Sequence, residues 1–441
     1  MKLGKGGIHI GRYRVTPLGV TVFGATLLAL AIIAVIIVLN HMSADPTITI
    51  AGTDQTGDAQ KEGQTVITAF TPTPMPTLQT TAEPTPEPEP TPASARIRFI
   101  GEISADTNVL TAAQQEDGSY DFSSMFSMIA GAVSDADYTV GDVEGSMGGI
   151  GEGYSGKKDY NTPESIIPNL KDAGVDMLAL ANDHALDAFF EGLLDTLKNC
   201  TEAGMAYAGA ASTQEEHDTP NIVEINGIQV CFLNYTTTLN SKEKSTSEDA
   251  IIYGVNLASK SNASADVEAA RAAGADVIVA IVSWGEDGST KTTDVQKKVA
   301  KVLTGAGVDV IIGYGPRVIQ PVYWLEEKDS DGNVTHRTLC ATSLGTFLSD
   351  SSDKYQDFGT IFEFTIQEGD DGSFAVESPV SIPTYVWRMT DGDKTDYHVL
   401  ACGEWLEEQP EGMSDTDYAR MREIWDNIGT ILTDTTKIEA N

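Results

Sequence analysis

The sequence has few of the residues that build most transition-metal and redox centres. It contains four cysteines, Cys200, Cys231, Cys340 and Cys402, and no two of them form a C-x-x-C pair. This spacing argues against the zinc and thiol-exchange motifs that need such a pair. Cys200 and Cys231 lie in apolar runs, which favours buried free thiols over a disulfide. Only six histidines are present, so imidazole, the commonest ligand of transition metals, is scarce.

Basic residues are also scarce. The 441 residues include 28 Lys and Arg against 65 Asp and Glu, a formal charge of −37. A charge of this size repels other polyanions over long range, which excludes nucleic acid as a partner. The first forty residues carry only basic charges (Lys2, Lys5, Arg12 and Arg14). The acidity therefore belongs to the rest of the chain.

One apolar stretch is long enough to cross a bilayer. No charged residue occurs between Val15 and Leu39, and a helix of this length spans a hydrocarbon core of about 30 Å. A cleaved signal peptide is the alternative, but its apolar region is usually only about 7–15 residues long. Because the basic residues precede the stretch, the positive-inside rule places the tail 1–14 in the cytoplasm. The sequence thus predicts a single-pass cell-membrane protein with a transmembrane helix at 15–39 and an extracytoplasmic main part.

A proline-rich segment follows the predicted span. Residues 40–94 are rich in Pro, Thr and Glu and include the run TPTPMPTLQTTAEPTPEPEPTP. Proline removes backbone donors and favours extended polyproline II, so this segment is predicted to be a disordered stalk. Beyond it, we expect one large folded domain at 95–384 and an acidic C-terminal extension at 385–441, with one helix at 415–428.

The folded part alternates short apolar runs with helical patterns. Runs such as RIRFIG, YTVGDV, VDMLALA, ADVIVAIVSWG and VDVIIGYG are typical of buried strands. Helices are predicted between them at 163–173, 190–203 and 293–306, which indicates an α/β protein. Later runs such as TIFEFTIQ and FAVESPV lack intervening helices and suggest antiparallel pairs in a mixed sheet.

Polar residues gather where the predicted strands end. Ligands in α/β folds collect beyond the carboxyl ends of strands, so these side chains are expected to converge. They are Glu102, Asp142, Glu144, Asn182, Asp183, His184, Ser283, Trp284, Tyr314 and Arg317.

The order of these loops resembles the CapA family of poly-γ-glutamate capsule synthesis proteins, which share the calcineurin-like metallophosphatase fold. The similarity runs from about residue 96 to 383, and its best stretch is GVDMLALANDHALDAFFEGLLDTLKNCTEAGMAYAGA. The segments GAGVDVIIGYGPRVIQPV and TSLGTF resemble later elements of the family. The resemblance implies a four-layer sandwich of mixed sheets flanked by helices.

Several metal-site positions depart from the family pattern. The first strand ends in Glu102 instead of aspartate, and an asparagine is replaced by Asp183 beside a retained His184. Four histidines of the pattern are lost, at the positions of Ser283, Tyr314, Gly315 and Arg317. A two-metal hydrolase needs several ligands for each of two adjacent cations, so the resemblance implies a degenerate site.

The remaining residues are expected to hold at most one divalent cation, Mn²⁺, Mg²⁺ or Ca²⁺, or none. Its ligands would come from Glu102, Asp142, Glu144, Asp183 and His184. The permanent charge of Arg317 would repel a nearby metal. We therefore hypothesise that Arg317 substitutes for a metal, either by pairing with Glu102, Asp183 or Glu144 or by gripping an anionic ligand.

Three further roles are assigned with alternatives. Asp183 and His184 would be catalytic if the site is active, although His184 equally suits a helix cap or a core hydrogen bond. Asn182 and Trp284 are assigned to ligand binding beside Arg317. For Trp284 the alternative is a tryptophan that closes a core edge, which is the commoner case.

Three functions remain open from the sequence. The first is a weakly catalytic or non-catalytic surface protein that helps to make, export or anchor an extracellular anionic polymer, with poly-γ-glutamate implied by the resemblance. Its partners would be the membrane, other capsule or surface-polymer synthesis proteins, and the polymer or its end. The second is a single-metal hydrolase of phosphoesters or amides, and the third is a scaffold for protein interaction alone.

Overall fold

The computed structural model describes the strands at 8–10 and 13–15 and residues 92–433, apart from 150, 152, 354 and 393. The chain divides into two units, Met1–Thr85 and Pro86–Asn441. In the first unit, β1 (Ile8–Ile10) pairs antiparallel with β2 (Tyr13–Val15). The predicted span at 15–39 lies outside the described residues except for Val15, as does the stalk up to residue 91. Among the described residues, no helix is both long and apolar enough to cross a membrane.

The second unit contains a seven-stranded sheet in the order β15-β14-β13-β3-β4-β5-β6. Strands β3 to β6 run parallel to one another, and β13, β14 and β15 add antiparallel neighbours beside β3. The strands are β3 (Ser94–Ile103), β4 (Tyr138–Val143), β5 (Met177–Ala179), β6 (Ala206–Ala208), β13 (Phe358–Glu368), β14 (Phe374–Asp391) and β15 (Lys394–Ala401).

A six-stranded sheet has the order β11-β12-β10-β9-β8-β7. Its central strands β8, β9, β10 and β12 are parallel, with antiparallel strands at both edges. The strands are β7 (Ile222–Ile225), β8 (Ile228–Thr236), β9 (Val277–Ser283), β10 (Val310–Tyr314), β11 (Val322–Lys328) and β12 (Val334–Ala341). These mixed sheets with helices confirm the predicted α/β class.

The two sheets pack face to face around a shared core. Phe99 and Val140 of the first sheet belong to one buried cluster with Val279 and Ile312 of the second. Because side chains alternate across a strand, the neighbouring residue Ile100 points to the other face, where it joins the cluster that includes residues of α5 and α6. Strand β9 is buried along its whole length, as expected for a parallel strand covered on both faces.

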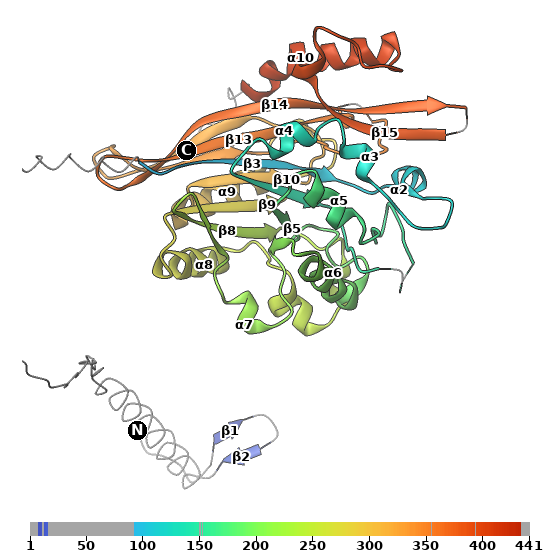
Figure 1. Ribbon diagram of the computed structural model, residues 1–441. Coiled ribbons are helices and arrows are strands. Elements are labelled where there is room, and N and C mark those ends of the chain that lie inside the picture. Colours follow the sequence, from blue (N-terminus) through green and yellow to red (C-terminus); the bar gives the residue numbers. More distant parts are fainter. Residues whose placement is uncertain are drawn as a thin grey trace, which may run out of the picture. The chain divides into compact units, whose positions relative to one another are not determined.

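Helices cover the outer faces of the sheets (Figure 1). Helix α9 begins where the sequence predicted, because Thr293 and Gln296 form a capping box that satisfies the first backbone donors. The helices are α2 (Thr107–Ala113), α3 (Ser123–Phe126), α4 (Ala130–Ser134), α5 (Ile166–Asp172), α6 (Phe189–Ala203), α7 (Gln214–His217), η2 (Lys242–Lys244), η3 (Ala250–Gly254), α8 (Lys260–Ala272), α9 (Asp294–Ala306), η4 (Cys402–Trp405) and α10 (Asp415–Thr433).

The C-terminal part is continuous with the folded domain, so the boundary predicted at residue 384 is wrong. That position falls inside β14, which pairs with both β13 and β15. Helix α10 packs across β14 (Figure 1), and Met421 and Ile424 share a buried cluster with Trp387 and Leu400. Because acidic residues dominate the composition of this segment, its apolar face was not recognised in the sequence. All four cysteines are free and buried, in agreement with the preference for free thiols.

Candidate functional site

The candidate site lies where parallel strands of both sheets end. Glu102 belongs to β3 and Asp142 to β4, and Glu144 follows directly after β4. The turn after β5 carries Asp183 and His184. Two overlapping groups of side chains each place potential ligand atoms within 4.8 Å of one another: Glu102, Asp142 and Glu144, and Glu144, Asp183 and His184.

Three carboxylates of the site are almost completely buried. The exposed fractions of Glu102, Asp142 and Glu144 are 1%, 1% and 3%. The backbone amide of Gly315 donates to Oε2 of Glu102, whereas Oε1 of Glu102 and Oδ2 of Asp142 have no hydrogen-bond partner within the described part of the chain. Buried polar atoms are rarely left without a partner, so these two oxygens need an explanation.

The carboxylates also resist ionisation. Burial and the charge of Glu144 raise the pKa of both Glu102 and Asp142 well above the ordinary value. Burial and the charge of Asp183 raise the pKa of Glu144 to about 7. Like charges in one low-dielectric site oppose each other unless a proton or a cation neutralises them.

A single hard cation fits this group of residues. Glu102, Asp142 and Glu144 offer only carboxylate oxygens, the ligand type that Mg²⁺, Ca²⁺ and Mn²⁺ prefer, and two of those oxygens accept no hydrogen bond from the described residues. These three residues would hold the ion. A bound cation would neutralise the carboxylates and could polarise an oxygen of a bound ester or amide.

Arg317 lies inside the site and is held there by protein groups. Its Nε atom is 3.4 Å from Oε1 of Glu102, and its Nη2 atom is 3.9 Å from Oδ1 of Asp106. The same Nη2 donates hydrogen bonds to Ser104 (2.6 Å) and to the hydroxyl of Tyr160 (2.9 Å). The side chain is only 8% exposed. Of the three pairings that the sequence allowed for Arg317, the structure contains the one with Glu102.

His184 is oriented by a carboxylate that the sequence did not identify as part of the site. Its Nδ1 atom lies 2.6 Å from Oδ2 of Asp187, whose side chain is fully buried. Its Nε2 atom is 3.8 Å from Glu144 and 3.7 Å from Asp183. Asn240 donates to Asp187 at 3.2 Å. His184 is thus held with Nε2 directed at the acidic residues of the site.

The ionisation of His184 gives a pH-dependent prediction. Burial lowers its pKa, but the hydrogen bond that His184 donates to Asp187 and the charges of Glu144 and Asp183 outweigh it and raise the pKa to about 9. Because the pKa of the folded state lies above the ordinary value of about 6.5, the imidazolium stabilises the fold below pH ~6.5 and loses this effect as the pH rises through about 9.

We therefore expect His184→Gln to lower the free energy of unfolding by about 2 kcal/mol at pH 6 and by much less at pH 10. Denaturant titrations at several pH values measure this difference in the metal-free protein. In NMR titrations, Asp187→Asn should move the His184 transition to a lower pH. A His184 signal that titrates near pH 6.5 in the wild type would contradict the arrangement.

Two residues assigned to ligand binding have side chains that are buried and already hydrogen-bonded within the protein. Asn182 is fully buried, and its side chain donates to Val143 and accepts from the amides of Gly145 and His184. Trp284 is 2% exposed and donates its indole N–H to the carbonyl of Thr342 at 2.9 Å. Its ring therefore closes the core edge, and the assignment of Trp284 to ligand stacking is wrong.

Three site residues were missed in the sequence. Asp106 accepts hydrogen bonds from Tyr160 (2.6 Å) and Ser349 (2.6 Å), and Tyr160 lies edge-on against His184 with ring centroids 4.8 Å apart. Asp187 is the third. Only Asp187 had a local signal, because it follows His184 at the i, i+3 spacing. Asp106 and Tyr160 lie in loops that lack a periodic hydrophobic pattern, so the sequence did not identify them.

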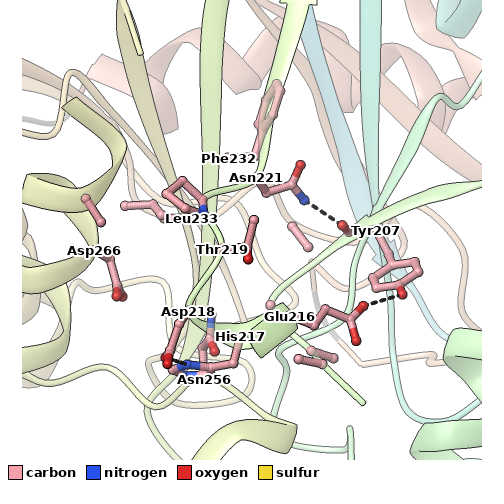
Figure 2. Close-up of a pocket in the computed structure, with 16 residues that line it drawn as sticks. Tyr207, Glu216, His217, Asp218, Thr219, Asn221, Phe232, Leu233, Asn256 and Asp266 are labelled. Carbon is pink, nitrogen blue, oxygen red and sulfur yellow. Dashed lines mark hydrogen bonds and ion pairs between the residues drawn. The ribbon is translucent and has the colours of Figure 1, made fainter. Parts of the chain in front are cut away.

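A separate pocket of about 320 Å³ lies beside α7 and β6 (Figure 2). Several of its polar lining residues are paired with one another: Glu216 accepts from the hydroxyl of Tyr207 at 2.6 Å, and Asp218 pairs with His217 at 2.9 Å. Asn221 donates to the carbonyl of Tyr207 at 2.6 Å. The two buried carboxylate oxygens that accept no hydrogen bond from the described residues make the strand-end site the stronger candidate for function.

Solved structures provide partial likenesses to the domain. The NAD nucleotidase of Haemophilus influenzae aligns over 77% of this chain and 68% of that chain, with 11% identity and a TM-score of 0.44. The calcineurin-like phosphoesterase YfkN of Bacillus subtilis aligns over 76% and 98%, with 12% identity and a TM-score of 0.41.

Sequence comparisons identify the family. The capsule biosynthesis protein CapA of Bacillus anthracis is 29% identical over 189 residues, which cover 42% of this chain and 43% of that protein. The PGA biosynthesis protein CapA of Bacillus subtilis (strain 168) is 23% identical over 297 residues, covering 64% and 70%. Residues 96–351, more than half of the chain, match the family described as bacterial capsule synthesis protein PGA_cap, and the protein therefore belongs to this family.

Proposed function

We propose that the protein is a membrane-anchored, extracytoplasmic member of this family that takes part in making, exporting or anchoring an anionic surface polymer. The functions named for the two Bacillus relatives, capsule and PGA biosynthesis, support this role, with poly-γ-glutamate as the implied polymer. The uncharged stretch at 15–39 supports a single membrane span after a cytoplasmic tail, and the proline-rich segment supports a stalk. Other synthesis proteins in the membrane are the proposed partners.

We further infer that the strand-end site holds at most one divalent cation and has weak or no hydrolase activity. The observation that carries this inference is the position of Arg317, whose Nε atom lies 3.4 Å from Glu102, one of the carboxylates of the site. A fixed positive charge at that distance repels a second cation and neutralises part of the carboxylate cluster in its place. We infer that the carboxylates keep the arrangement of a metal site, with the guanidinium of Arg317 in place of one metal ion.

A single-metal hydrolase of phosphoesters or amides is the second candidate. The His184–Asp187 pair favours it, because a carboxylate at Nδ1 keeps the imidazole protonated and directs Nε2 toward the acidic residues. Such an imidazolium is suited to protonate a leaving group. In that case Asp183 and His184 would touch the reacting atoms, and the cation would be held by the neighbouring carboxylates.

Deleting the gene in the organism that encodes it tests the proposed role. We expect the glutamate recovered after acid hydrolysis of washed cell surfaces to fall severalfold, and the wild-type gene to restore it. A Glu144→Ala/His184→Ala gene should restore it as well, because the proposed role does not depend on catalysis. Immunoblots of membrane fractions check that each variant is present and anchored.

The matched control carries the same types of substitution outside the site, Glu224→Ala/His217→Ala. Surface polymer that is unchanged by the deletion would contradict the proposed role. Restoration by the control but not by the site variant, at equal protein levels, would instead support the hydrolase.

A further inference from the structure

Two grooves flank the N-terminal half of helix α9. The α8–α9 groove, of about 410 Å³, is lined by Ala263, Val299, Val302, Lys260 and Lys298 among others. The α9–α10 groove, of about 400 Å³, has Lys291 and Lys297 in its lining. Both volumes lie in the range of ligand sites, which are usually apolar with a few polar groups.

The charge of these grooves is opposite to that of the chain. The chain has 65 acidic and only 28 basic residues, yet among the residues that the structure describes neither groove has an acidic side chain in its lining, and each has two lysines. Lys260 and Lys298 have no ion-pair partner among the described residues, and Lys297 has only a 3.7 Å contact with Asp294, whose side chain is fully exposed. These lysines are therefore available to an anionic ligand.

The floors of the grooves are apolar. Val299 and Val302 pack on the buried cluster beneath α8 and α9, while Val295 remains 54% exposed at the edge of the α8–α9 groove. An exposed valine beside unpaired lysines is suited to a ligand with both methylene groups and negative charges, because lysine ammonium groups pair with carboxylates while the floor buries carbon.

The α8–α9 groove is also connected to the strand-end site. Thr237 lines the groove and donates to the carbonyl of Ser283 through its amide (3.0 Å) and its hydroxyl (3.2 Å). The hydroxyl of Ser283 in turn donates to Asp183 at 3.4 Å. Two hydrogen-bonded residues, Thr237 and Ser283, therefore link this groove to the acidic site.

We propose that the two grooves bind one extended polycarboxylate chain that crosses α9. Two similar grooves on either side of one helix match a repeating chain better than a single small molecule. In a γ-linked glutamate chain, each carboxylate is attached to a main-chain carbon, and this carbon and two methylene groups separate successive amides. The carboxylates of such a chain would pair with the lysines, and its methylene groups would pack on the apolar floors of the grooves. This inference rests on the proposed function, because it names the place where the polymer binds.

Fluorescence anisotropy with the full-length protein and a labelled γ-linked glutamate decamer tests the proposal. We expect Lys260→Gln/Lys298→Gln and Lys291→Gln/Lys297→Gln each to weaken binding about fivefold, since each double variant removes two ammonium groups that pair with carboxylates. The affinity should fall with added salt. Val295→Ser should weaken binding without changing the salt dependence.

The control Lys328→Gln/Lys394→Gln removes the same charge from exposed lysines outside both grooves and should leave the affinity unchanged. Equal losses in the control, a loss from only one lysine pair, or no binding to the wild type would overturn the proposal. A γ-linked trimer, too short to reach both grooves, should bind much more weakly than the decamer. Because surface polymer is measured independently in the deleted strain, failure of the grooves can be distinguished from failure of the proposed function.

Discussion

Replacing Arg317 by leucine is expected to lower the free energy of unfolding by about 3–5 kcal/mol at pH 7 in the metal-free protein. The guanidinium is 8% exposed and lies between Glu102 and Asp106, so its removal leaves buried carboxylates without a counter-charge. Ser104 and Tyr160 also lose a hydrogen-bond donor. Chemical denaturation followed by circular dichroism measures the loss.

A second substitution separates charge from packing. In Arg317→Leu/Glu102→Gln the uncompensated carboxylate is also removed, and we expect more than half of the lost stability to return. Arg337→Leu is the matched control, because Arg337 is 53% exposed and lies 3.8 Å from Glu326; exposed pairs contribute at most about 1 kcal/mol. A loss of less than about 1 kcal/mol from Arg317→Leu would show that Arg317 does not neutralise the cluster.

Asp142→Asn is expected to change stability in opposite directions without and with a divalent cation. Burial and the charges of Glu144 and Glu102 raise the pKa of Asp142, so the folded state binds a proton that the unfolded state has released at neutral pH. This effect is absent below pH ~4 and grows as the pH rises toward the raised pKa. Without metal, the variant should therefore be more stable than the wild type by about 1 kcal/mol or more at pH 7, and nearly equal to it at pH 4.

With a saturating cation the order should reverse. An ion present at a hundred times its dissociation constant stabilises the wild type by about 2.7 kcal/mol, and the variant, which lacks one charged ligand, should lose most of this gain. Thermal denaturation with and without Mn²⁺, Mg²⁺ and Ca²⁺ provides the measurement, and calorimetry gives the affinities. Asp195→Asn, on the exposed face of α6, is the control. Equal stabilisation of wild type and Asp142→Asn would place any bound ion elsewhere.

The strand-end residues were the part of the site that the sequence could predict. The carboxyl ends of parallel strands lie at one edge of a sheet. From this rule the sequence predicted that Glu102, Asp142, Glu144 and His184 lie close together. The partners that fix these residues come from loops. Tyr160 arrives from a segment with no periodic pattern, and its contact with Arg317 joins residues 157 positions apart, a separation that local patterns do not encode.

Burial explains the other differences between sequence and structure. Trp284 follows a strand, where an exposed ring would suit a ligand, but the carbonyl of Thr342 satisfies its N–H inside the core. The C-terminal extension seemed separate because its charges dominate its composition. Its apolar residues, among them Met421 and Ile424, recur at helical spacing and close over β14.

The position of Arg317 also affects how the two sheets separate. It follows β10 of the six-stranded sheet, whereas Glu102 lies in β3 of the seven-stranded sheet, so their ion pair bridges the seam of the sandwich. Opening that seam exposes a guanidinium and a carboxylate that must part before water can solvate both fully, which raises the barrier to unfolding. We therefore expect the sandwich to unfold slowly, and slow unfolding limits cleavage by proteases that act faster than the fold recloses.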